Sequence, residues 1–106
     1  MYLSYFETAR IDALESVSMG LDGLDAKGFR IVVTNIEVAF LDPVLAGETV
    51  TITTEVREVR RASHHWHQEI MRDGRAAVRM DLRAAMTDLA GKPVRVPDFF
   101  REAVTA

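Results

Sequence analysis

Apolar residues in the first part of the chain recur at steps of three and four. The residues with this spacing are Leu3, Phe6, Ala9, Ala13 and Val17. Such spacing places side chains on one face of an α-helix, and no glycine or proline interrupts it. The pattern predicts one long apolar helix over residues 2–17, with Glu7 as a carboxylate in its first half.

Four later stretches have the polar and apolar patterns of β-strands. They span residues 29–41, 49–59, 63–71 and 75–88. Asp73-Gly74 separates the last two, and this dipeptide is a strong hairpin signal. We expect an antiparallel meander of four strands wrapped around the first helix, followed by a short helix over residues 99–104. The fold class is therefore α+β.

Two features of the middle of the chain lead to further expectations. The stretch SMGLDGLDAKG contains three glycines. We predict an irregular connection there, long enough to be a lid or rim, with Gly20 ending the first helix. The strand over residues 29–41 is apolar on both faces, so we expect it to be covered on both sides, at least in part.

Composition narrows the class of protein. The chain has 106 residues, which is the size of a single domain, here residues 1–106. A net charge of −3 gives no basic excess for binding nucleic acid. The absence of cysteine excludes disulfides, thiolate metal sites and a cysteine nucleophile. Glu7 and Arg10 interrupt the first apolar run too early for a membrane span. We expect a cytoplasmic protein without a membrane partner.

Several segments resemble one enzyme family in order and spacing. YLSYFETAR at positions 2–10 is similar to the start of the central helix in the 4-hydroxybenzoyl-CoA thioesterase-like family of acyl-CoA thioester hydrolases. The segments at 29–43, 47–50, 67–70 and 88–93 resemble later strands and turns of that family. The resemblance implies the hot-dog fold, with one central helix wrapped by an antiparallel sheet and a short C-terminal helix. It also implies a homodimer or homotetramer.

One part of the family pattern does not occur in this sequence. The family has an outer first strand before the helix, and then a loop of the type Asp-x-x-Gly-His. The aspartate of that loop is the usual nucleophile or general base. Here Met1 stands inside this region. We therefore expect either a chain truncated at its N-terminus or a protein that has lost the catalytic loop.

The resemblance implies hydrolysis of an acyl-CoA or aroyl-CoA thioester, with coenzyme A as part of the substrate and no resident cofactor. This reaction needs a carboxylate and donors for the developing oxyanion. Glu7 is the candidate carboxylate, and the first-turn amides from Tyr2 to Tyr5 are the candidate donors. Glu7 alternatively pairs with Arg10 on the same helix. The alternative function is a catalytically silent domain that binds an acyl ligand or serves in assembly.

Three further groups of residues are candidates for ligand binding. Arg60 and Arg61 form a basic turn that suits the phosphates of coenzyme A, or a solvated hairpin. Asn35 lies with Glu37 among apolar neighbours, where it contacts ligand or pairs between strands. The third group is a row of histidines on a later strand.

Alternation places His65, His67 and Glu69 on one strand face, with neighbouring side chains about 7 Å apart. A His-x-His pair on a strand can bind zinc, but no further ligand is marked out by the sequence. The alternative is a solvent-facing polar row, with Trp66 and Ile70 packing on the opposite face. Further along, Arg79, Asp81 and Arg83 are predicted to form cross-strand ion pairs on the outer face. We expect no metal.

Overall fold

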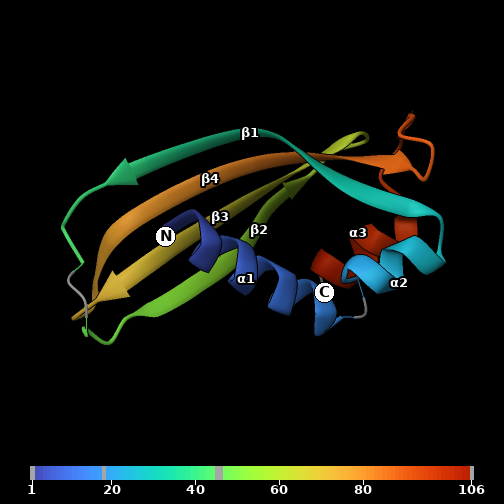
Figure 1. The fold of residues 1–106 in the computed structure, drawn as a ribbon. Coiled ribbons are helices and arrows are strands. Elements are labelled where there is room, and N and C mark those ends of the chain that lie inside the picture. Colours follow the sequence, from blue (N-terminus) through green and yellow to red (C-terminus); the bar gives the residue numbers. More distant parts are fainter. Residues whose placement is uncertain (1, 18, 45–46, 106) are drawn as a thin grey trace.

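The structure is a computed structural model that describes residues 2–17, 19–44 and 47–105. These residues form two helices, then five strands, and then a third helix (Figure 1). The helices are α1 (Tyr2–Glu15), α2 (Leu21–Ala26) and α3 (Asp98–Thr105). The strands are β1 (Phe29–Phe40), β2 (Thr51–Val59), β3 (Ser63–Arg72), β4 (Arg75–Asp88) and β5 (Pro93–Val94). This arrangement confirms the predicted α+β class.

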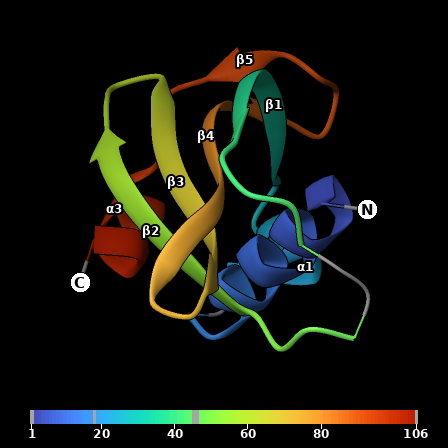
Figure 2. The ribbon, with the colours of Figure 1, turned by 90° about the vertical axis from the view of Figure 1, so that its left-hand side faces the viewer.

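The strands form one antiparallel sheet in the order β1-β4-β3-β2, and β5 pairs with the end of β4. The predicted meander is right for β2, β3 and β4, which follow one another as neighbours. It is wrong for β1, which pairs with β4 along its length and not with β2. The chain therefore passes from one side of the sheet to the other between β1 and β2 (Figure 2).

Helix α1 lies against one face of the curved sheet, which we call the inner face, and α2 and α3 lie toward one end (Figure 1). Alternate residues of β4 point to this inner face and are buried: Val78, Met80, Leu82, Ala84 and Met86. Phe6 and Leu14 of α1 and Phe100 of α3 complete the core. Burying each large apolar side chain contributes about 1.5 to 3 kcal/mol.

The segment between α1 and β1 differs from its prediction. Helix α1 ends at Glu15, two residues early, and the predicted loop contains the short helix α2. Leu24 of α2 is buried in the core, so tertiary packing offsets the cost of the glycine within this helix. Gly20 does not end α1 in a left-handed conformation, because it precedes α2 with φ of −67°. A Cβ at Gly20 would lie 2.5 Å from the Glu15 side chain, so this close approach favours glycine.

Strand β1 leaves apolar side chains exposed within the single described chain, which does not test the predicted cover on both sides. Val32, Val33 and Ile36 remain 41–45% exposed. The reason is that β1 pairs with β4 along one edge, while α1 packs mainly over β2 at the other side of the sheet. Apolar residues on both faces of a strand therefore did not ensure its burial in this chain.

Candidate functional site

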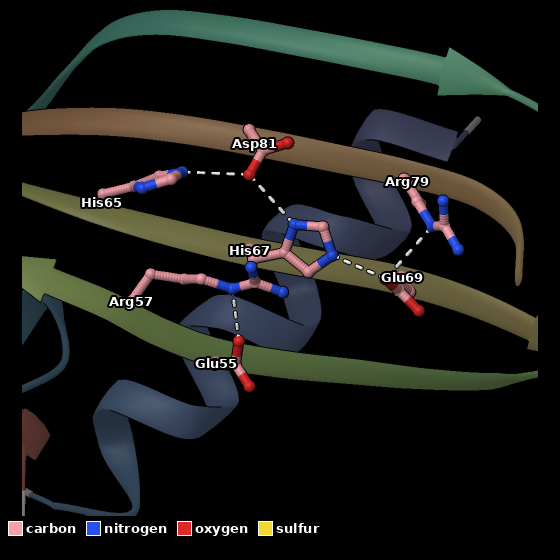
Figure 3. Close-up of polar contacts among 7 residues, drawn as sticks. All are labelled: Glu55, Arg57, His65, His67, Glu69, Arg79 and Asp81. Carbon is pink, nitrogen blue, oxygen red and sulfur yellow. Dashed lines mark hydrogen bonds and ion pairs between the residues drawn. The ribbon is translucent and has the colours of Figure 1, made fainter.

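A polar network lies on the outer face of the sheet, away from α1 (Figure 3). Both histidines of the predicted row meet Asp81, a residue of the neighbouring strand β4. Asp81 Oδ1 lies 3.0 Å from His65 Nε2 and 2.9 Å from His67 Nδ1. The other ring nitrogen of His67, Nε2, lies 2.6 Å from Glu69 Oε2. We call these four residues, together with Arg79, the outer network.

The outer network includes one arginine, Arg79, and a second arginine, Arg57, lies beside it on β2 (Figure 3). Arg79 Nε lies 3.3 Å from Glu69 Oε2, which gives the cross-strand ion pair predicted for Arg79. On β2, Arg57 pairs with Glu55 (Figure 3). Asp81 pairs with histidines instead of arginines, because the strand register places it opposite His67. The outer network thus alternates in charge across β3 and β4.

The surroundings of the network change the pKa of two of its members. Burial lowers the pKa of His67, but its hydrogen bonds to Glu69 and Asp81 outweigh burial and raise that pKa above the usual value. Burial raises the pKa of Asp81, and its hydrogen bonds to His67 and His65 outweigh this and lower it. Both shifts favour the charged forms, a histidinium beside a carboxylate.

The zinc hypothesis for His65, His67 and Glu69 finds no support in this geometry. Their nitrogen and oxygen atoms bond to one another and to Asp81. Across the described parts of the chain, no cluster of three or more histidines and carboxylates is placed to hold a metal ion. Asp81 is the carboxylate that the sequence did not mark out, and its outward position two residues after Arg79 was the available signal.

An open hollow of about 300 Å³ adjoins the outer network. Its lining residues are Asn35, Glu37, His65, Asp81, Leu82 and Arg83. Asn35 is opposite Arg83 in the register of β1 and β4, next to a bulge at Thr34. The Thr34 hydroxyl donates to the carbonyl of Arg83, which secures this bulge. The structure therefore brings Asn35 and Glu37 to the histidine row, a combination that the sequence did not suggest.

Glu7 lies on the other side of the sheet from that hollow, on α1. Its side chain is exposed, and its negative charge acts on Arg10 one turn later. Burial lowers the pKa of Arg10, and the charge of Glu7 opposes this shift. Tyr5, in the turn before, is 56% exposed. The side chain of Tyr2 lies outside the described residues. The candidates Glu7 and Asn35 are thus separated by the sheet within one chain.

The basic turn after β2 lies at the end of the sheet where α3 packs, apart from the start of α1 (Figures 1 and 2). Arg60 Nε pairs with Glu58 Oε1 at 2.6 Å, and its carbonyl accepts from Arg101 of α3. Arg61 is exposed, and its carbonyl accepts from the amide of Val96. Both predicted phosphate-binding residues are exposed, and the guanidinium of Arg60 already faces a carboxylate.

Two buried polar residues on the inner face of β3, His64 and Gln68, were missed by the sequence reasoning. His64 accepts a hydrogen bond at Nδ1 from Trp66 Nε1 at 2.6 Å. Because indole is only a donor, the neutral ring of His64 carries its proton on Nε2. That Nε2 has no hydrogen-bond partner among the described residues. The signal was available, since both polar residues alternate with the inward-facing Trp66.

The comparison with family models decides the family. The model of the thioesterase-like superfamily matches residues 1–104. The chain belongs to this superfamily. The match covers α1, the whole sheet and most of α3, so it includes every element described above.

Similar proteins agree with the family. YbaW of Escherichia coli, a probable thioesterase, is 26% identical with a TM-score of 0.84, over 96% of this chain and 78% of that one. A thioesterase of Thermus thermophilus, solved with coenzyme A and Zn, is 27% identical with a TM-score of 0.82, over 97% of this chain and 74% of that one. These likenesses confirm the hot-dog fold.

A curated relative from Synechocystis sp. is named "Putative esterase sll0410". It is 24% identical over 70 residues, or 66% of this chain. The match covers 42% of that protein, so this chain spans less than half the length of the relative. Among the described residues, no helix has both the length and the apolar character needed to cross a membrane.

Proposed function

We propose that this chain acts on acyl-CoA or aroyl-CoA thioesters as a hydrolase. The observation that carries the proposal is the superfamily match over residues 1–104. A 27% identical thioesterase that was solved with coenzyme A supports a coenzyme A thioester as the substrate class. In the reaction, a water oxygen bonds to the thioester carbonyl carbon while a carboxylate takes one proton of the water, the carbon–sulfur bond breaks, and the thiolate takes up that proton.

Glu7 is the carboxylate proposed for this step. It is exposed on α1, so a bound thioester or a water molecule has access to it. The unpaired amides at the start of an α-helix, here near Tyr5, are suited to stabilise the developing oxyanion. Arg60 and Arg61 are proposed to bind the phosphates of coenzyme A. The basic turn lies apart from Glu7 (Figures 1 and 2), so they bind either a ligand held at Glu7 of another copy or an extended ligand that reaches from Glu7 of the same chain.

We also propose that the chain works as a homodimer or homotetramer in the cytoplasm. Support comes from β1, whose exposed Val32, Val33 and Ile36 belong to a strand that pairs along one edge in the described sheet. An open strand edge favours pairing with another chain. Light scattering after size-exclusion chromatography tests this. Ile36→Lys is expected to convert the oligomer to a monomer, and a wild-type monomer would contradict the proposal.

The activity is tested by release of free thiol from a panel of acyl-CoA and aroyl-CoA esters. Glu7→Gln is expected to lower kcat by about 100-fold or more, as for loss of a general base. Asp12→Asn, an exposed carboxylate on the same helix, is the matched control and is expected to keep full activity. Unchanged turnover in Glu7→Gln would exclude Glu7 as the catalytic carboxylate.

A catalytically silent domain predicts a different result in the same assay. In that case the wild-type chain releases no thiol from any ester, while calorimetry detects binding of an acyl-CoA. The sheet separates Glu7 from Asn35 within one chain. If catalysis requires both residues in one site of one chain, this separation favours the silent domain.

A further inference from the structure

Gln68 of β3 is completely buried between α1 and the sheet, with an exposed fraction of 0%. Its side-chain amide contacts three groups. Nε2 donates to the Phe6 carbonyl at 2.8 Å and to the Thr54 hydroxyl at 3.1 Å. Oε1 accepts from Arg10 Nη1 at 3.3 Å. One side chain of the sheet therefore holds α1 at two points, one turn apart.

These partners fix the orientation of the amide. A carbonyl oxygen only accepts, so the NH₂ group must face Phe6, and a guanidinium only donates, so the oxygen must face Arg10. Both N–H donors are used. A buried polar group that loses its partners destabilises the folded chain. The amide thus has one satisfied arrangement, which exists only when α1 is correctly placed.

The contact is directly connected to Glu7. The Phe6 carbonyl belongs to the same planar peptide unit as the amide nitrogen of Glu7. Arg10 follows Glu7 by three residues, and its charge interacts with that of Glu7. The two points held by Gln68 therefore lie immediately before and one turn after the proposed catalytic carboxylate.

The apolar contacts of α1 do not provide the same precision. Phe6 and Leu14 bury their side chains in the core, but hydrophobic attraction is non-directional and allows small rotations and shifts of a helix. Hydrogen bonds weaken steeply as their angles change. Among the described residues, the bonds of Gln68 therefore add directional contacts that constrain the rotation and the axial position of α1.

We propose that Gln68 is a positioning residue that sets α1 on the sheet, and thereby holds Glu7 where it acts on the thioester. This inference rests on the proposed function for its effect on turnover. Gln68 itself is enclosed and does not touch the substrate. Its contribution passes through the Phe6–Glu7 peptide and through Arg10.

Gln68→Met tests the proposal, because methionine has a similar length and flexibility but cannot form the three hydrogen bonds. We expect kcat to fall about 10- to 100-fold, as for a small displacement of a catalytic group, while KM changes less than about threefold. We also expect hydrogen exchange at the amides of residues 7–11 to speed up at least about tenfold, with little change in α3.

Thr54→Val is the matched control, since it removes one bond of Gln68 but leaves both bonds to α1. Its kcat and its exchange in α1 are expected to stay close to those of wild type. Activity is compared per folded molecule, so a purely structural role would lower the folded fraction and leave kcat unchanged. An unchanged kcat in Gln68→Met would overturn the proposal.

The exchange measurement separates this inference from the proposed function. If the wild-type chain has no thioesterase activity, the proposed function fails, while exchange still decides whether Gln68 holds α1. Unchanged exchange of α1 in Gln68→Met would overturn the positioning role whether or not the chain is active. Faster exchange in α1 together with a selective fall in kcat supports both steps of the inference, namely that Gln68 positions α1 and that this position holds Glu7 for catalysis.

Discussion

His64 and His67 are three positions apart on β3 and face opposite sides of the sheet. His64 is 1% exposed on the inner face, where its ring lies 4.9 Å from that of Phe100. Burial, and then the charge of Arg10, lower its pKa to about 4. The side chain of His67 is 12% exposed, and carboxylates on either side of its ring raise its pKa in spite of burial.

Burial is the main cause of the low pKa of His64, whereas at His67 the carboxylate partners outweigh burial. The ring of His64 is almost fully buried and stays neutral, whereas the ring of His67 is partly buried and favours the charged form. The inner face offers burial, an indole donor and a guanidinium, none of which stabilises a second positive charge. The outer face offers Asp81 and Glu69. The two faces are therefore expected to respond differently to mutation and to pH.

The largest expected effect is the loss of apolar packing on the inner face. Ile70→Ala removes a side chain that is buried in the core and is expected to lower the free energy of unfolding by about 2–5 kcal/mol. Glu69→Ala, the outer-face neighbour, is expected to cost about 1 kcal/mol or less. Urea denaturation at pH 7 measures both. Similar losses for the two variants would contradict the assignment of the faces.

Acid is expected to destabilise the inner face through His64. In the unfolded chain, His64 binds a proton as the pH falls below about 6.5. In the folded chain, His64 stays neutral until the pH approaches 4. Stability therefore falls as pH decreases through this window, by on the order of 3 kcal/mol in total. Denaturation at several pH values checks this, with His64→Leu as reference because leucine does not titrate.

The reference variant also loses the hydrogen bond from Trp66, but it does so equally at every pH. The wild-type chain should therefore lose stability more steeply than His64→Leu between about pH 6.5 and pH 4, since the other titrating groups are common to both. Equal losses would mean that His64 takes up a proton in the folded chain without penalty.

The smallest expected effect, with the opposite sign, comes from His67. Its folded pKa is raised, so its stabilising contribution is fully present below a pH of about 6.5 and is lost as pH rises through the folded pKa. At about pH 5.5 we expect the free energy of unfolding of wild type to exceed that of His67→Gln by about 1 kcal/mol or less. This difference is expected to be smaller at about pH 8.5. A difference that grows toward alkaline pH would contradict this prediction.

Local patterns accounted for much of the fold because they depend on near neighbours along the chain. The steps of three and four predicted α1, and alternation predicted the bounds of β4 and the opposite faces of Trp66 and His67. Glycines concealed α2, whose helix forms because Leu24 is buried by distant residues. The pairing of β1 with β4 was also missed, because strand order depends on which distant segments meet.

The candidate site was less predictable for the same reason. The sequence placed His65 and His67 on one strand face, but it did not show which partners these histidines, Asn35 and Glu7 would meet. Asp81 joined the histidines through the register of β3 and β4, and β1 brought Asn35 beside them. The proposed roles of Glu7, Arg60 and Arg61 stay predictions, because each depends on where a thioester binds relative to the sheet.

The sequence by itself determined the elements with a clear period, the direction of side chains on β3 and β4, and the resemblance to thioesterases. Those properties follow from residue types and their spacing. Only the tertiary structure decided that β1 lies beside β4, that Asp81 joins two histidines, and that Gln68 holds α1. Each of these joins residues from separate elements, and the free energy of such a contact depends on geometry that local patterns do not contain.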